Sequence, residues 1–248
     1  MTAYNSCFVL IRGLLREQRH WGEFKQILQK QFPLSDIITL EIPGNGRLYQ
    51  QTSANNIAAY TESLRSQLPR QGNINLIALS MGGMIALDWM NKYPTEINSA
   101  VLINTSVRPH SPFFHRLRWQ CYPAIFSMLR NSAEQIEQQI LDLTSNTYEN
   151  KTELLKQWQQ WRKQNPVSKS SALNQLIAAA RFSNPEKPLH PILIVSSKND
   201  RLVNHSCSKK LHDIWNSDYQ QHDTAGHDLP LDEPQWLAQT IYQWHKSV

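Results

Sequence analysis

The sequence has little of what would place the protein in a specialised class. It has only three cysteines in 248 residues. They lie at no spacing typical of a metal site or a disulfide framework, so a reducing compartment is the simplest interpretation. No basic stretch followed by an apolar segment and a cleavage site opens the chain, and no apolar run approaches the ~20 residues that span a bilayer. These absences predict a soluble, cytoplasmic protein.

Sites for metals and phosphates are also missing. No cluster of His, Cys and Asp has metal-ligand spacing, and residues 44–46 (Gly-Asn-Gly) are typical of a turn rather than a dinucleotide-binding loop. The isolated His20, His110 and His115 are expected on the surface or in a cap. The composition, with 40% hydrophobic and 18% charged residues, is ordinary for a globular protein. We therefore expect no cofactor.

The positive charge is unevenly distributed. The formal net charge is +5. Residues 108–185 contain ten Lys or Arg and five Asp or Glu, whereas the rest of the chain has fifteen of each kind. All of the excess therefore belongs to the middle third. This positive charge could attract anionic molecules, and the aromatic side chains of the same segment could bind an acyl chain, although an ordinary solvated face would show the same excess of charge.

Short apolar runs alternate with helical patterns. Expected strands lie at residues 8–11, 36–42, 74–79, 100–103 and 191–196. This alternation predicts an α/β protein with a mainly parallel, doubly wound sheet of about six strands and helices on both faces. Residues 108–185 show helical stripes and no convincing strand. We expect a helical cap at 108–185, inserted into a core formed by residues 1–107 and 186–248.

One serine lies where a strand gives way directly to a helix. The apolar run Ile74–Leu79 ends at Ser80, and a helical pattern begins at Met81. Ala78 and Gly82 flank the serine at two residues on either side. Small residues there permit a strained turn that lifts the hydroxyl clear of the sheet. A serine that merely caps the helix is the alternative interpretation.

Two later segments supply what a serine nucleophile needs. A base must take the hydroxyl proton, and an acid must hold the tautomer of that base. Asp200 follows an expected strand, and His227 precedes the last helical pattern. Asp223 and Asp228 are rival acids. Asp228 directly follows the histidine, where its side chain should point elsewhere, so Asp200 is preferred.

The motif around Ser80 and the chain order Ser, Asp, His resemble the α/β-hydrolase superfamily, in particular its small esterase-like members with a cap. The resemblance implies that Ser80 forms an acyl-enzyme, that His227 is general base and acid, and that Asp200 orients His227. Many members carry an antiparallel hairpin ahead of the first strand. This sheet begins almost at residue 1, so we expect a core trimmed at its N-terminus.

The resemblance also implies an oxyanion hole. Its donors would be the backbone N–H groups of Met81, after the nucleophile, and Leu14, in the loop after the first strand. Members of the superfamily typically have His-Gly where this chain has Arg12-Gly13. We expect Arg12 to brace the loop through hydrogen bonds to carbonyl groups.

Substrate-binding residues are expected beside this loop and at the start of the cap. They are Gly13, Arg116, Arg118 and Trp119. Arg116 and Arg118 lie closest in sequence to the point where the cap leaves the sheet. A basic rim there would attract an anionic acyl carrier, such as coenzyme A or an acidic carrier protein, and an apolar underside would bind an acyl chain.

The residues therefore predict a serine hydrolase that cleaves a small-molecule carboxylic ester or thioester. The same triad also serves amide hydrolysis, C–C hydrolysis and acyl transfer. The fold further includes lyases that use the triad as a base, and receptors that hydrolyse their ligand slowly. These alternatives stay open at the level of sequence.

Overall fold

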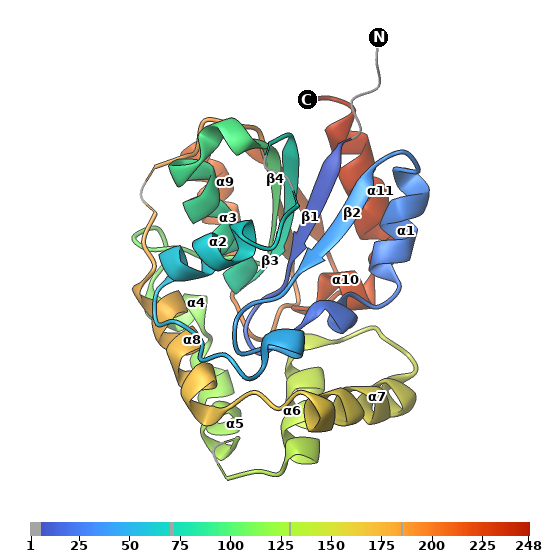
Figure 1. Ribbon diagram of the computed structural model, residues 1–248, viewed down its shortest axis with the longest axis vertical. Helices are drawn as coiled ribbons and strands as arrows, with labels where there is room; N and C mark the ends of the chain where they lie inside the picture. Colours follow the sequence, from blue (N-terminus) through green and yellow to red (C-terminus); the bar gives the residue numbers. More distant parts are fainter. Residues whose placement is uncertain (1–5, 70–71, 129, 185) are drawn as a thin grey trace.

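A six-stranded parallel sheet forms the centre of the protein (Figure 1). The computed structural model describes residues 6–69, 72–128, 130–184 and 186–248. Neighbouring strands, in the order β2-β1-β3-β4-β5-β6, all pair in parallel, which confirms the predicted α/β class and sheet. The strands are Cys7–Ile11 (β1), Asp36–Leu40 (β2), Ile74–Leu79 (β3), Ile97–Ile103 (β4), Ile192–Ser197 (β5) and Asp218–His222 (β6).

The strand order reverses at β1. The chain runs outward from β1 to β2 and then returns to place β3 on the other side of β1. In such sheets the connections after the two central strands go to opposite faces of the sheet and leave a crevice between them at the carboxyl edge. The register pairs Ile11 with Ala78, so these two connections start almost side by side, at Arg12 and Ser80.

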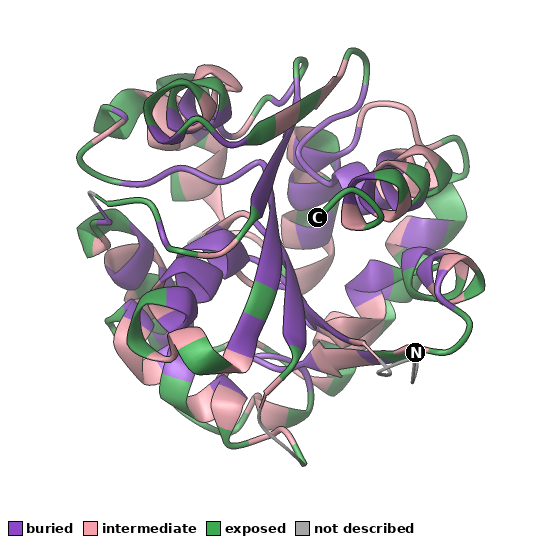
Figure 2. Ribbon diagram, turned by 90° about the horizontal axis from the view of Figure 1, so that it is seen from above, coloured by how far each residue is buried: buried purple, intermediate pink, exposed green. Residues whose placement is uncertain are grey.

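Helices cover both faces of the sheet (Figure 1). Side chains from α2, α3 and α9 pack on one face, and side chains from α1 and α11 on the other. Because both faces are covered, the central strands are buried (Figure 2) and consist of nearly continuous apolar runs. The helices of these layers are Phe24–Gln31 (α1), Ile57–Arg65 (α2), Met81–Lys92 (α3), Ser206–Trp215 (α9), Leu229–Asp232 (α10) and Pro234–His245 (α11).

Between β4 and β5 the described residues form five further helices, which we call the helical insertion. They are Phe113–Arg116 (α4), Tyr122–Ser127 (α5), Ala133–Thr144 (α6), Lys151–Gln164 (α7) and Lys169–Arg181 (α8). Figure 1 shows them beyond the carboxyl ends of the strands. The domain boundaries at 107/108 and 185/186 stay a prediction.

Sequence signals account for where two of these helices begin. Ser132 and Gln135 cap α6 reciprocally, and the Ser168 hydroxyl accepts a hydrogen bond from the N–H of Ser171 at the start of α8. Short 3₁₀ turns complete the fold at Gln18–Trp21 (η1), Gly46–Leu48 (η2), Pro94–Glu96 (η3) and Trp119–Cys121 (η4). No helix within the described ranges has both the length and the apolar composition needed to cross a bilayer.

Strand β6 and helix α9 are two elements that the sequence patterns did not indicate. β6 has the sequence Asp-Tyr-Gln-Gln-His, and none of its residues is fully buried. It lies at the edge of the sheet, where fewer apolar side chains are needed and polar ones discourage further pairing. The apolar pattern on which the prediction relied is therefore absent from this strand.

Candidate active site

Ser80 occupies the turn between β3 and α3 in a strained backbone conformation. Its φ of 59° and ψ of −120° lie in a region of backbone angles where residues other than glycine are rarely found. Its N–H donates to the carbonyl oxygen of Ile103 at 2.8 Å. Its carbonyl oxygen accepts from the Thr105 hydroxyl at 2.8 Å. These two bonds to the end of β4 and the loop after it hold the turn and leave the serine side chain partly exposed.

The turn approaches the end of β1 so closely that two glycines are required. A Cβ on Gly82 would lie 2.4 Å from the carbonyl oxygen of Ile11, and a Cβ on Gly13 would lie 2.9 Å from the Cβ of Ser80. The carbonyl oxygen of Ile11 belongs to the backbone of β1 and cannot move without disturbing the sheet. These glycines therefore bring the loop after β1 directly beside Ser80.

Asp200 and His227 form a buried pair. Oδ2 of Asp200 lies 2.6 Å from Nδ1 of His227, and the two residues are 1% and 5% exposed. The other carboxylate oxygen accepts from the backbone N–H groups of Leu202 and Val203, at 2.8 and 2.9 Å. The carboxylate is therefore fixed in orientation. A contact of this kind favours a proton on Nδ1, which leaves Nε2 of the imidazole free to accept one.

The two rival acids lie elsewhere. Asp223 has an exposed side chain that pairs with Lys198 at 3.6 Å. Asp228 accepts both of its bonds from Arg12, at 2.9 and 2.6 Å. Of the three candidates, only Asp200 has His227 as its partner.

The expected bonding of Arg12 to carbonyl groups is wrong. Its guanidinium instead makes a two-pronged ion pair with Asp228, and both residues are 2% exposed. It also lies over the ring of Trp21, at 5.0 Å from the centroid. A carboxylate matches the planar fork of an arginine better than single carbonyls do. The pair joins the loop after β1 to the segment that carries His227.

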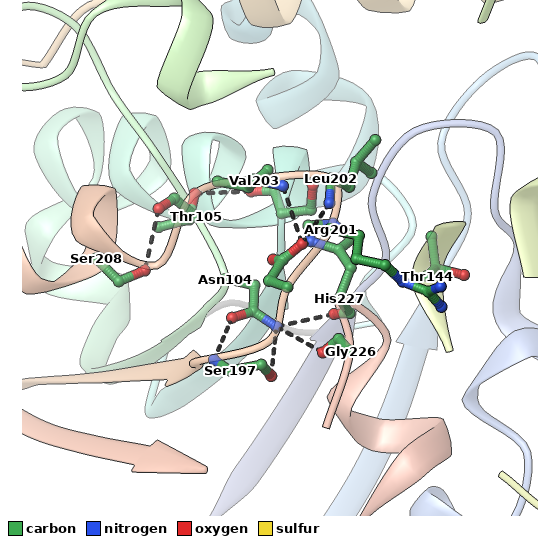
Figure 3. A network of polar contacts seen from close by, with 12 residues as sticks. Asn104, Thr105, Thr144, Ser197, Arg201, Leu202, Val203, Ser208, Gly226 and His227 are labelled. Carbon is green, nitrogen blue, oxygen red and sulfur yellow. Dashed lines mark hydrogen bonds and ion pairs between the residues drawn. The ribbon is translucent and has the colours of Figure 1, made fainter. Parts of the chain in front are cut away.

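Asn104 is a site residue that the sequence analysis missed. It directly follows β4 with a φ of 47°. Its side-chain amide donates to the carbonyl oxygen of His227 at 2.9 Å and to the hydroxyl of Ser197 at 3.0 Å, and accepts from the N–H of Ser197 at 2.7 Å. Figure 3 shows this side chain between the end of β5 and the His227 segment. An Asn directly after a predicted parallel strand is the signal that could have indicated it, since Asn tolerates positive φ.

The two predicted oxyanion residues lie beside Ser80. Met81 is the first residue of α3, so its N–H has no acceptor within the helix. Leu14 lies in the loop after β1, where the next residue, Leu15, has a φ of 60°. Leu14, Ser80 and Met81 line one cavity together. The role of their N–H groups as oxyanion donors stays a prediction.

Two cavities meet at Ser80. The smaller has a volume of about 120 Å³ and is lined by both Ser80 and His227. Helices α5 and α6 and the segment after α5 supply much of its apolar wall, through Ile125, Met128, Ile140 and Leu143. The larger has a volume of about 570 Å³, within the usual range for small-molecule sites.

The predicted substrate-binding residues separate into two groups. Gly13 lines the smaller cavity and Arg116 the larger. Arg118 and Trp119 line neither. The guanidinium of Arg118 donates to the backbone carbonyl of Asp200 at 2.9 Å, and Trp119 is 64% exposed on the outer surface. Among the residues that the structure describes, no group of three His, Cys, Asp or Glu side chains is placed to hold a metal ion.

His20 was expected on the surface or in the cap, but it is buried beneath the helical insertion. Its ring packs edge-on against Trp158 and Trp161 of α7. Burial holds the pKa of His20 well below its ordinary value, and the positive charge of Arg16 acts in the same direction. His20 therefore stays neutral and serves as part of the contact between the core and the insertion.

Comparison with known proteins identifies the family. A family model described as serine aminopeptidase, S33, matches residues 49–234, which include Ser80, Asp200 and His227. The chain belongs to this family of α/β-hydrolases. Membership supports hydrolase activity. Among curated proteins, none matches the sequence of this α/β-hydrolase.

Solved structures share the fold of this α/β-hydrolase over nearly its whole length. A thermophilic esterase from Thermogutta terrifontis has a TM-score of 0.77 at 19% identity, covering 99% of this chain and 91% of the other. The enol-lactonase from Burkholderia xenovorans LB400 has a TM-score of 0.80 at 15% identity, covering 98% and 92%. An esterase from Exiguobacterium antarcticum has a TM-score of 0.78 at 14% identity, again covering 98% and 92%. At these identities the likeness shows the fold alone.

Proposed function

We propose that this α/β-hydrolase cleaves a carboxylic ester or thioester through an acyl-enzyme formed on Ser80. The observation that carries the proposal is the buried contact of 2.6 Å between Asp200 and His227, with His227 and the strained Ser80 lining one cavity. The similar structures are named as esterases and as an enol-lactonase, and their names agree with ester chemistry.

The proposed reaction begins with proton transfer. Nε2 of His227 takes the proton of the Ser80 hydroxyl as the oxygen attacks the carbonyl carbon of the substrate. The carbonyl oxygen becomes an oxyanion, which the N–H groups of Leu14 and Met81 would stabilise. His227 then gives its proton to the leaving alcohol or thiol. Water repeats the sequence on the acyl-enzyme and releases the acid.

Asp200 would act through His227. Its fixed carboxylate holds the imidazole in the tautomer that can accept a proton and stabilises the positive charge that follows. Asn104 also fixes the backbone of His227, because its side-chain amide donates to the carbonyl oxygen of His227. The imidazole is therefore positioned before the substrate arrives, which reduces the reorganisation needed during the reaction.

The helical insertion would serve as the cap. Its apolar side chains face Ser80 and His227 across the smaller cavity, so they would exclude water and accept a short acyl chain. The larger cavity would take the rest of a small ester. Binding of an anionic acyl carrier stays a prediction from the charge distribution.

The decisive experiment is covalent labelling with a fluorophosphonate, together with turnover of short p-nitrophenyl esters. Ser80→Ala should abolish labelling and lower kcat by about 10⁶-fold, because removing a triad nucleophile has an effect of that order. The thermal unfolding temperature should change little. Ser66→Ala, an exposed serine at the end of α2, is the matched control and should behave as the wild type.

Two outcomes would contradict the proposal. Retention of most esterase activity by Ser80→Ala would show that another group is the nucleophile. Labelling of Ser80 without measurable turnover of any ester would favour a slowly hydrolysing receptor instead.

A further inference from the structure

Two arginines line the larger cavity without an acidic neighbour in its wall. Arg108 precedes the helical insertion, and Arg116 lies at the end of α4. Ser80 lines the same cavity. None of the described residues around it is Asp or Glu. The positive charge is therefore not balanced within the wall.

Arg116 is held in place by the end of a helix. Its Nη1 and Nη2 groups donate to the carbonyl oxygens of Ala180 and Ala179, at 3.2 and 2.6 Å. These carbonyls belong to the last turn of α8, where a helix favours a cation. The guanidinium is thus fixed in orientation at the cavity wall, while its Nε is buried and has no partner among the described residues.

Arg116 is only partly buried, and the fully buried arginines among the described residues are paired differently. Arg12 pairs with Asp228 and Arg16 with Glu137, each at less than 3 Å. Arg116 has no such carboxylate among the residues that the structure describes. Burial lowers the pKa of Arg116; Cys207 opposes this shift, and the nearby charge of Arg108 adds to it. An anion in the cavity would relieve both effects.

We infer that the substrate carries a carboxylate on the part that occupies the larger cavity, and that Arg116, assisted by Arg108, binds this carboxylate. The inference rests on the proposed function and adds a substrate class to it. A cavity of about 570 Å³ has room for this part of a small ester. Two of the five guanidinium N–H donors are engaged by α8, and the planar fork of an arginine matches the two oxygens of a carboxylate.

Two pairs of esters test the inference, one for a carboxylate on the acyl part and one for a carboxylate on the alcohol part. The members of each pair differ only in whether the carboxyl group is free or methylated. Mono-p-nitrophenyl adipate is compared with its neutral methyl ester, which places the charge on the acyl part. 4-Acetoxybenzoate is compared with methyl 4-acetoxybenzoate, which places it on the alcohol part. The wild type should show a higher kcat/KM for the anionic member of at least one pair.

Arg116→Gln should lower kcat/KM for the preferred anionic ester by about 10- to 100-fold, the effect expected when a charged hydrogen-bonding partner is lost. The loss should appear mainly as a higher KM. The neutral ester should change less than about threefold. Arg116→Lys should recover part of the preference, and Arg108→Gln should lose less than Arg116→Gln. Arg181→Gln, an exposed arginine at the end of α8 that lines neither cavity, is the control.

A binding measurement separates this inference from the proposed catalysis. Monomethyl adipate should raise the thermal unfolding temperature of the wild type and of Ser80→Ala, but not of Arg116→Gln. If it does so while no ester is turned over, the proposed function fails and the anion site stands. Equal losses on anionic and neutral esters in a folded Arg116→Gln protein, or a wild-type preference for neutral esters, would overturn the inference.

Discussion

At the scale of single residues, the carboxylate that faces His227 is the clearest determinant of the proposed chemistry. Asp200→Asn preserves the shape of the side chain but favours the wrong imidazole tautomer. It should lower kcat by about 10⁴-fold, as in other Ser-His-Asp enzymes. Turnover of p-nitrophenyl esters at neutral pH measures this.

Asp223→Asn is the natural comparison, because Asp223 lies on the loop that leads to His227 but is exposed. It should leave kcat within about twofold of the wild type, as most exposed substitutions do. A larger loss in Asp223→Asn than in Asp200→Asn would show that the wrong acid has been assigned.

The sequence predicted Ser80, Asp200 and His227 because each is identified by its local context. A strand and a helix flank the serine directly, and the other two follow from chain order. The pairing of Arg12 with Asp228 could not be found in this way. The two residues are 216 positions apart, and three strands separate β1 from β6 in the sheet. The segment after β6 has to return across the sheet to reach Arg12, and no local pattern in the sequence indicates this.

At the scale of secondary-structure elements, helix α8 fixes the loop that carries Leu14. Gln175 of α8 is fully buried. Its Oε1 accepts from the N–H of Leu15 at 2.9 Å, and its Nε2 donates to Asn45 at 2.8 Å and Ser53 at 3.0 Å. One side chain of the helical insertion therefore satisfies the N–H of a residue with positive φ, directly beside a predicted oxyanion donor.

Gln175→Ala should reduce both stability and turnover. The unfolding free energy should fall by about 1–3 kcal/mol, because buried polar groups lose their partner. The value of kcat should fall more than KM rises, since the oxyanion loop would be less well positioned for the transition state. Steady-state kinetics and urea denaturation measure the two effects.

Gln175→Glu keeps an acceptor for Leu15 and should recover part of kcat. Gln157→Ala, an exposed glutamine on α7, controls for the loss of a helical glutamine. A destabilised Gln175→Ala protein with unchanged kcat would limit Gln175 to a purely structural role.

The sequence could not indicate Gln175, since a glutamine within a helical pattern usually lies on the protein surface and does not stand out. Its burial results from the packing of α8 against the turn after β2, which the spacing of apolar residues does not reveal. The same pattern did indicate helices between β4 and β5, because helix formation depends on local periodicity.

At the scale of the whole molecule, buried charges join the helical insertion to the core. Glu137 of α6 accepts from Arg16 in the loop after β1 at 2.7 Å and also pairs with Arg162 of α7. The Arg16 guanidinium lies 4.3 Å from the ring centroid of Trp158. Removing Glu137 would leave Arg16 and Arg162 without their shared carboxylate, which is strongly destabilising. The insertion should therefore unfold together with the core.

Glu41 makes the stability of the whole fold depend on pH. It is 1% exposed after β2. Burial raises its pKa from 4.5 to about 7, although a hydrogen bond from the N–H of Gln18 opposes the shift. The folded state thus prefers the protonated carboxyl. The stability that this preference contributes is fully present below about pH 4.5 and is lost as the pH rises through about 7.

Glu41→Gln should therefore weaken the decline in unfolding free energy between pH 4.5 and pH 7. Urea denaturation of both proteins at several pH values measures this. Glu149→Gln, an exposed glutamate, should keep the wild-type pH dependence. A Glu41→Gln protein whose stability changes with pH as steeply as the wild type would show that other groups are responsible.

The backbone of Ser80 also bears on how this protein can evolve. Its φ of 59° and ψ of −120° would suit glycine without strain, whereas a serine held there costs about 1–3 kcal/mol. Selection for a stable fold alone would therefore act against serine at this position. A descendant that no longer needed the hydroxyl would be expected to replace it early, even while the surrounding sheet stayed intact.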